Sequence, residues 1–239
     1  MMSTGIRFLN RSQINEQQWN RALEDSINAN IYAYSWYLDA VSPGWCALVH
    51  GDYKEIMPLP IRRKYLIDYA FMPPYCQQLG VFSPTNVEAD TICVFLNAIP
   101  RHVRFVDLNL NAQNLHTPAG LKTQNRINLV LKLGRGVDDV RNRFSSNHKR
   151  NVRKFQDAGL IIDKQGDPEE VIRLFEMGRG GRLGHYPDSD HMIFRRLLAA
   201  VQENAKVMTL LARNTDGLAV GGAIFFEAFA GSYFIFSGV

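Results

Sequence analysis

Residues 136–159 read GVDDVRNRFSSNHKRNVRKFQDAG, and this stretch separates two parts of the chain in which we expect the same order of elements. Its apolar residues recur at steps of three, four or eight, which predicts one face of a helix, formed by Val137, Val140, Phe144, Val152 and Phe155. Six cations lie off that face: Arg141, Arg143, Lys149, Arg150, Arg153 and Lys154. Two aspartates in the first turn and Gly159 at the end favour the same limits. The pattern predicts one strongly basic amphipathic helix near mid-chain.

The bulk composition is that of a globular protein. Of 239 residues, 46% are hydrophobic and 21% are charged, which allows a sizeable core and excludes a disordered or collagen-like chain. The net charge of +4 is modest and is concentrated in the basic helix. We therefore expect a local anionic partner and not the global field of a dedicated nucleic-acid binder.

The cysteines and the apolar runs indicate a cytoplasmic protein without a membrane span. Cys46, Cys76 and Cys93 are odd in number and lie in apolar or aromatic surroundings, which favours reduced, buried thiols over disulfides. A catalytic thiol is the alternative. No apolar run reaches the roughly 18 residues that a membrane helix needs. The spacing of His and Cys predicts no metal site.

The first half reads as an α/β domain spanning residues 1–134. Strand patterns are expected at 6–9, 45–50, 55–62, 65–72, 77–82, 102–110 and 126–133. Three helices are expected between them. Asn15 with Gln18 and Thr85 with Glu88 have the spacing of capping boxes, and Ser35 can cap a short helix through Ala40.

The second half, residues 135–239, repeats this plan after the basic helix. A strand at 160–163 precedes a helix that Asp167 caps and Pro168 begins. A loop rich in Gly and Arg leads to a longer helix over 193–201, and strands at 206–213, 218–226 and 232–239 form a meander. An exposed apolar edge on the last strand would favour self-association.

This order of elements, seen twice, resembles the GNAT superfamily of acyl-CoA-dependent acyltransferases. The doubled arrangement is similar to that of the Fem-like aminoacyltransferases, in which two GNAT-like domains are fused. The resemblance is carried by WYLDAV (36–41), IMPLPIRRK (56–64), PPYCQQLGVFS (73–83), SSNHKRNVRKFQDAGL (145–160) and the closing GGAIFFEAFAGSYFIFSGV. It implies a mixed α/β sheet in tandem GNAT-like folds, the second incomplete at Val239, and transfer of an acyl or aminoacyl group to an amine, often on a cell-wall precursor.

The resemblance also implies acyl-CoA or aminoacyl-tRNA as co-substrate, with no tightly bound cofactor. GNAT enzymes hold the donor pyrophosphate with a loop Q-x-x-G-x-G/A at a helix N-terminus. Gln77 and Gly80 match its opening, but Phe82 stands at the last glycine, where a side chain would block close approach of the backbone. A non-catalytic module that holds an anionic partner through the basic helix is therefore the rival function.

Candidate site residues fall in four groups. His148 lies on the apolar side of the basic helix, as a core histidine or as a catalytic group facing a cleft, and Glu227 is a base candidate if burial raises its pKa. Arg143, Arg150 and Lys154 are expected on one side of that helix, with Lys149 and Arg153 as a second pair, suited to the phosphates of a small molecule or a tRNA. A solvated basic face is the alternative. Tyr75, Gln77 and Gln78 are groove candidates, and His185 and Tyr186 lie in a lid candidate.

Overall fold

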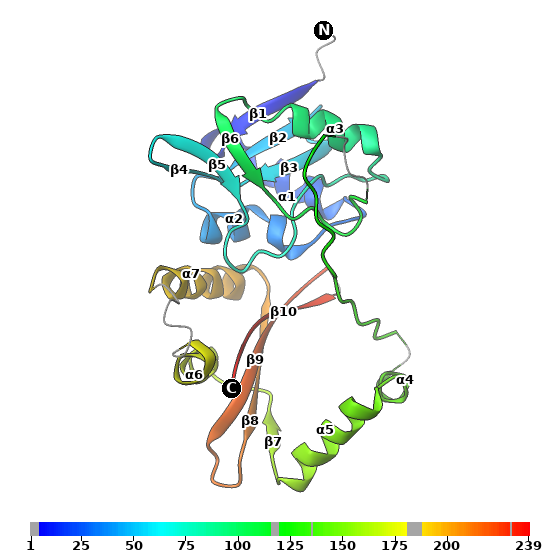
Figure 1. Cartoon of the computed structure of the whole chain (residues 1–239), viewed down its shortest axis with the longest axis vertical. Coiled ribbons are helices and arrows are strands. Elements are labelled where there is room, and N and C mark those ends of the chain that lie inside the picture. Colours follow the sequence, from blue (N-terminus) through cyan, green and yellow to red (C-terminus); the bar gives the residue numbers. More distant parts are fainter. Residues whose placement is uncertain (1–4, 116–119, 135, 181–187, 230) are drawn as a thin grey trace. The chain divides into compact units, whose positions relative to one another are not determined.

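The computed structural model describes the chain except residues 1–4, 116–119, 135, 181–187 and 230 (Figure 1). The fold is mixed α/β, and the described residues form three small sheets and seven helices besides short helical turns. Two compact units share the chain. Unit 1 comprises Met1–Gln124, Pro187–Lys206 and Glu227–Tyr233, and unit 2 comprises Asn125–Tyr186, Val207–Phe226 and Phe234–Val239. The units therefore divide the chain differently from the expected domains 1–134 and 135–239.

The first sheet of unit 1 is antiparallel and contains β1 (Ile6–Asn10), β2 (Cys46–His50) and β3 (Glu55–Leu59) in that order. Leu48 and Met57 on these strands join Ile92 and Phe95 of α3 (Ala89–Asn97) in one buried apolar cluster. Burial of such side chains drives folding because apolar surface leaves water. The sheet of β2 and β3 and the helix α3 therefore share one hydrophobic core.

The two helices after β1 also pack into unit 1. Helix α1 (Glu16–Glu24) begins after Asn15, whose side chain accepts from Gln18 N, as expected. Its buried Trp19 lies 4.7 Å from the Trp45 ring, centroid to centroid. Helix α2 (Ser35–Val41) packs against α7 (Asp188–Asn204), and Arg196 donates to the Ala40 carbonyl at 2.6 Å. The long helix of the second half thereby belongs to unit 1.

A second sheet of unit 1 contains β4 (Ile61–Lys64), β5 (Ile67–Phe71) and β6 (Val103–Asp107). β4 and β5 form a hairpin, and β5 pairs with β6 in parallel. Figure 1 shows this hairpin projecting from the rest of unit 1. Pro60 separates β3 from β4, where the sequence predicted one strand.

The third sheet contains β7 (Ile161–Asp163), β8 (Lys206–Arg213), β9 (Ala219–Ala228) and β10 (Gly231–Gly238) as consecutive neighbours. Unit 2 holds most of it. Helix α6 (Pro168–Phe175) begins as predicted, with Asp167 accepting from Glu169 N at 2.9 Å. Arg213 of β8 donates to both Asp163 and Glu170, which ties β7 and α6 to one strand.

The basic helix is not continuous, so the prediction of one helix from Gly136 to Gly159 is wrong. It forms α4 (Val137–Asn142) and α5 (Ser146–Asp157), and neither helix has a buried residue. The Ser145 side chain accepts from His148 N at 3.2 Å and starts the second helix. A serine bonded to the backbone in this way favours a new N-terminus over continuation of the first helix.

Other elements also differ from expectation, both strands that depend on long-range partners and two helix caps. Residues 126–133 have no strand, and Ile127 and Leu129 are each 90% exposed. Residues 77–82 make only isolated bridges, Ile56 with Phe82 and Leu79 with Leu110. Ser35 does not cap its helix, and α3 begins after Glu88 without the expected capping box.

Candidate functional site

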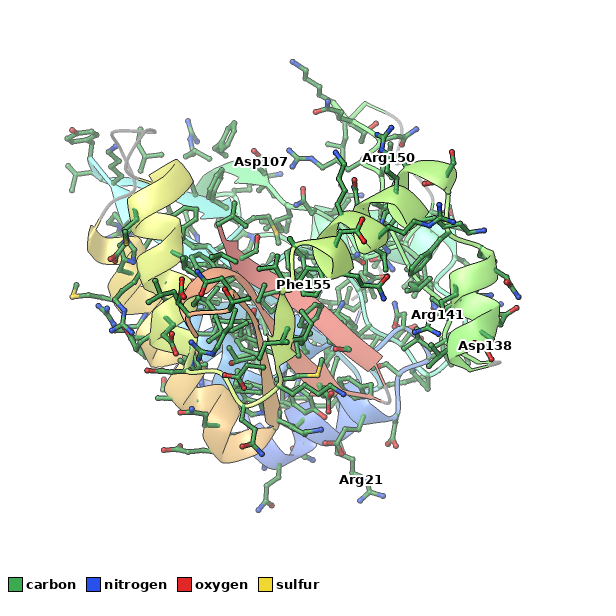
Figure 2. The ribbon with its side chains drawn as sticks, turned by 90° about the horizontal axis from the view of Figure 1, so that it is seen from below. Arg21, Asp107, Asp138, Arg141, Arg150 and Phe155 are labelled. Atoms are coloured by element: carbon green, nitrogen blue, oxygen red, sulfur yellow. The ribbon has the colours of Figure 1, made fainter. Side chains whose placement is uncertain are left out.

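Four cations of α5 form an exposed surface, hereafter the basic surface: Lys149, Arg150, Arg153 and Lys154. Arg150 donates to Asn147 Oδ1 at 2.6 Å, and Figure 2 shows it on the helix. Among the ion pairs of the described residues, none includes a member of this surface. Cations without carboxylate partners retain their attraction for an external anion. The basic surface is thus available to phosphates.

Arg143 does not share a helix with Arg150 and Lys154, because the helix is interrupted before Ser145. That part of the prediction is wrong. It pairs with Asp139 at 3.0 Å and donates to the Lys132 carbonyl at 2.7 Å. Together with Gly134, these residues line a pocket of about 310 Å³ in unit 2. Arg143 therefore lines a separate, partly neutralised hollow.

The two catalytic candidates lie in different surroundings from those expected. His148 is exposed on α5 beside Phe144, with ring centroids 5.4 Å apart, and does not face a core. Glu227 pairs with Lys206 at 2.8 Å, a partner that the sequence pattern did not reveal. The Glu227 side chain is 31% exposed, so it lacks the burial that the base role required. His185 and Tyr186 lie outside the described residues.

Tyr75, Gln77 and Gln78 are held by contacts within unit 1. Tyr75 has a φ of 63°, its hydroxyl donates to the Asp190 carbonyl, and its ring centroid lies 4.9 Å from that of Phe194. The Gln77 carbonyl accepts from Asn109 Nδ2, and Gln78 Oε1 accepts from Ala112 N. The segment thus contributes to the packing of unit 1 through backbone and side chain alike.

The segment that matches the opening of the GNAT loop has its backbone N–H groups engaged. Those of Leu79 and Phe82 donate to the carbonyls of Asn109 and Ile56, each at 2.8 Å. Those of Val81 and Ser83 donate to the side-chain oxygens of Asn114 and Asn28, at 2.9 and 3.2 Å. Phe82 is fully buried. Phosphate binding by a loop requires free, converging N–H groups, so these four cannot serve a donor pyrophosphate while the bonds hold.

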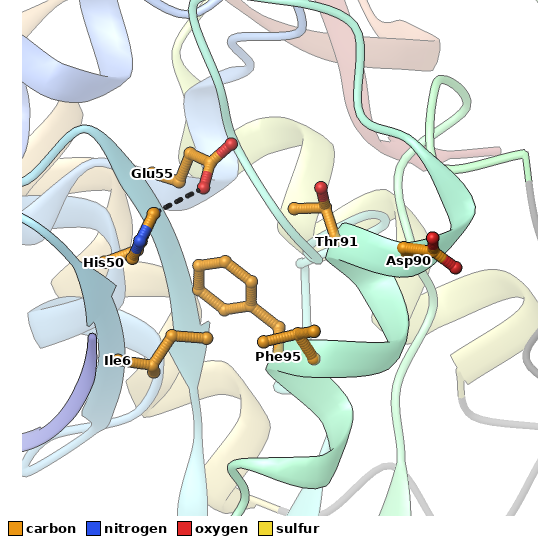
Figure 3. A pocket seen from close by; sticks show the side chains of 7 residues that line it. Ile6, His50, Glu55, Asp90, Thr91 and Phe95 are labelled. Atoms are coloured by element: carbon orange, nitrogen blue, oxygen red, sulfur yellow. Dashed lines mark hydrogen bonds and ion pairs between the residues drawn. The ribbon is translucent and has the colours of Figure 1, made fainter. Parts of the chain in front are cut away.

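A second pocket, of about 230 Å³, lies in unit 1 between the β2–β3 hairpin and α3 (Figure 3). His50 Nδ1 lies 2.8 Å from Glu55 Oε2, and the Glu55 side chain is only 15% exposed. Because a carboxylate can only accept, Nδ1 is the donor in this contact. The pocket is lined by Ile6, His50, Glu55, Asp90, Thr91, Val94 and Phe95.

Sequence reasoning missed the His50–Glu55 pair although a signal was present. The two residues end and begin strands that the pattern predicted, on either side of a Gly51-Asp52 turn. Antiparallel pairing of those strands places His50 opposite Glu55. A hairpin register drawn from the sequence would have found the pair. The carboxylates and the hydroxyl of this pocket, with no Lys or Arg in its lining, suit a small cation such as an amine.

Among the described residues, no helix is long and apolar enough to cross a lipid bilayer. Comparison with known proteins gives no family: no protein-family model matches the chain, and no curated protein matches it.

Proposed function

We propose that the chain is an acyltransferase or aminoacyltransferase with tandem GNAT-like folds, which moves an acyl group from a thioester or ester donor to an amine. The observation that carries the proposal is a repeated order of elements. β1, α1, α2, β2 and β3 are matched by β7, α6, α7, β8 and β9, and both sheets keep the order of the chain. Two such series in one chain support a duplicated plan.

The reaction requires two ligands side by side and no covalent intermediate on the protein. A base first removes a proton from the bound ammonium group. The free amine nitrogen then attacks the donor carbonyl carbon, the thiolate or alkoxide leaves with the bonding electrons, and the nitrogen loses its second proton to solvent. Positioning of the reactants supplies most of the acceleration in such a step. His50, oriented by Glu55, is the base candidate in the pocket that suits an amine.

Donor binding is assigned to the basic surface of α5. The N–H groups of Leu79, Val81, Phe82 and Ser83 are engaged in unit 1, whereas the cations of the basic surface lie exposed. Coenzyme A and tRNA both carry phosphates, which Lys and Arg bind in a salt-dependent manner. The acceptor would be a cell-wall precursor or another amine.

The second candidate function is a non-catalytic module that holds an anionic partner on the same basic surface. The closed segment at 79–83 favours it, because an enzyme that lost its donor loop in unit 1 could retain the fold for binding alone. Both candidate functions require binding of an anion, but only the transferase converts its ligand to a product.

Calorimetric titration of the whole chain with acetyl-CoA, coenzyme A, a UDP-linked muropeptide and tRNA, at two salt concentrations, tests the shared step. We expect saturable binding of one donor, and about a tenfold or greater loss in the double variant Arg150→Glu, Lys154→Glu. Arg21→Glu reverses a cation that is 84% exposed in unit 1 and should leave binding unchanged. Equal binding by the double variant and the parent chain would reject the basic surface.

Turnover separates the two functions. With the donor so identified, transfer of its labelled acyl group to an amine should be reduced about 10²-fold or more in His50→Gln, with donor affinity unchanged. Binding without transfer to any amine tested would favour the binding module.

A further inference from the structure

The tip of the β4–β5 hairpin combines two features that are unfavourable in a folded protein, a strained backbone and exposed apolar side chains. Tyr65 and Leu66 form a two-residue connection, and both have left-handed backbones, with φ of 48° and 64°. Such turns favour Asn-Gly, because side chains with a bulky β-carbon are strained there. Both side chains are also exposed, Tyr65 to 87% and Leu66 to 92%. The described residues therefore leave both side chains almost wholly in solvent.

The sheet behind the tip continues the apolar surface. Ile67, Phe71 and Phe105 are exposed to 51%, 45% and 59%. The register pairs Tyr69 with Phe105, and alternate residues of β5 point to the same side, so these three side chains share one face with Tyr69. This face and the tip together are hereafter the hairpin surface.

The segments that form the hairpin surface carry a net positive charge. Residues 61–71 and 101–107 contain five Lys or Arg and two Asp residues. One of those aspartates, Asp68, is held by Arg63 at 2.6 and 2.8 Å. Lys64 Nζ lies 5.5 Å from the centre of the Tyr65 ring, beside the tip. Cations adjoin the most exposed apolar residues of the hairpin.

We propose that the hairpin surface docks on an anionic lipid bilayer, with Tyr65 and Leu66 inserted among the headgroups and the surrounding cations in contact with lipid phosphates. Tyrosine suits this depth because its ring is apolar and its hydroxyl is polar. Basic residues next to a membrane gain from the negative surface potential. The inference goes beyond the proposed transfer reaction and does not depend on it.

The form of the hairpin favours a membrane over a protein partner. Figure 1 shows a narrow hairpin that projects from unit 1, with the strained residues at its end. A stable protein interface usually buries about 800 Å² on each partner and is broad. A projecting tip with two apolar side chains inserts into lipid without a matching cavity, and the net positive charge selects anionic lipid.

Co-sedimentation of the whole chain with vesicles tests the proposal. Vesicles of phosphatidylcholine with about one third phosphatidylglycerol should bind the protein, and vesicles of phosphatidylcholine alone should bind it at least about tenfold less. The double variant Tyr65→Asn, Leu66→Gly should lose at least about tenfold in binding. Because Asn-Gly relieves the backbone strain, the same variant should melt about 2–4 °C higher. A loss of vesicle binding in this variant would then not be caused by unfolding.

A matched control removes two apolar side chains elsewhere. Ile127→Ser, Leu129→Ser replaces residues that are each 90% exposed in unit 2, and vesicle binding should be unchanged. If this control loses binding while the hairpin variant retains it, the membrane contact lies at residues 126–133 and the proposal fails. It also fails if anionic vesicles do not bind the parent chain. A hairpin variant that changes only the mass measured by light scattering would assign the surface to self-association.

Discussion

Gly80 occupies a backbone position that other residues fit poorly. Its φ is 104°, and a β-carbon there would overlap Asn114 Oδ1, the atom that accepts from Val81 N. Gly80→Ala should therefore strain the backbone and displace a buried hydrogen bond at once. We expect a loss of about 2–4 kcal/mol in the free energy of unfolding, measured by urea denaturation.

Gly134 provides the control for this substitution. A β-carbon at Gly134 meets no atom within 4 Å, and its φ is not in the left-handed range. Gly134→Ala should change the free energy of unfolding by less than about 0.5 kcal/mol. Equal stabilities of the two variants would show that the Asn114 contact does not hold unit 1 together.

Among the elements, β7, α6 and β8 are joined by Arg213. Hydrogen bonds from Gln165 N and from Arg213 lower the pKa of Asp163 below its ordinary 3.8, and Arg213 lowers the pKa of Glu170 below its ordinary 4.5. A carboxyl with a depressed pKa in the folded state stabilises the fold above its unfolded pKa, and this stabilisation is lost as the pH falls through the folded pKa. The ion pairs of Arg213 with Asp163 and Glu170, hereafter the clamp, should thus stabilise the fold fully above about pH 5. Their contribution should decrease in more acidic solution.

Arg213→Met tests the clamp while keeping a long side chain. Its melting temperature should be lower than that of the parent chain at pH 7, and the difference should shrink as the pH is lowered below 4.5, the ordinary pKa of Glu170. Arg21→Met removes an exposed cation 3.9 Å from Asp25 and should melt like the parent. A difference between Arg213→Met and the parent that stays constant with pH would indicate lost packing instead of lost ion pairs.

For the whole molecule, the segment 121–134 is the expected site of first proteolysis. It is exposed along its length and has no helix or strand, and it contains Lys122, Arg126 and Lys132. Limited trypsin digestion followed by mass spectrometry should find the first cuts there. The cations of α5 should be cut later, because a helix must open before a protease can bind its backbone.

The nicked chain should remain one particle in gel filtration. Helix α7 follows the cut in sequence and packs against α2, which precedes it, so the two fragments share the core of unit 1. They should separate only in denaturant. Fragments that separate under native conditions would show that the α2–α7 contact is too weak to hold unit 1 together.

Elements whose signals are local were predicted from sequence. Asp167 and Pro168 begin α6, Asn15 caps α1, and Lys206–Arg213 is a strand at its predicted limits. Helix caps and alternating apolar residues act within a few positions, so one segment contains the whole signal. The cations of the basic surface were likewise predicted, because a charged residue can be identified from the sequence without knowing its neighbours in the fold.

The sequence by itself determined α1, α6, β8, the basic surface and the mixed α/β class. Tertiary structure decided which backbone groups found partners: residues 126–133 alternate like a strand yet have no neighbouring strand, and the N–H groups of Val81 and Ser83 donate to Asn114 and Asn28. A helix closes its hydrogen bonds within itself, whereas a strand or a loop depends on residues far along the chain. The donors at Leu79, Val81, Phe82 and Ser83 were therefore engaged by backbone carbonyls and side chains that no local pattern indicates.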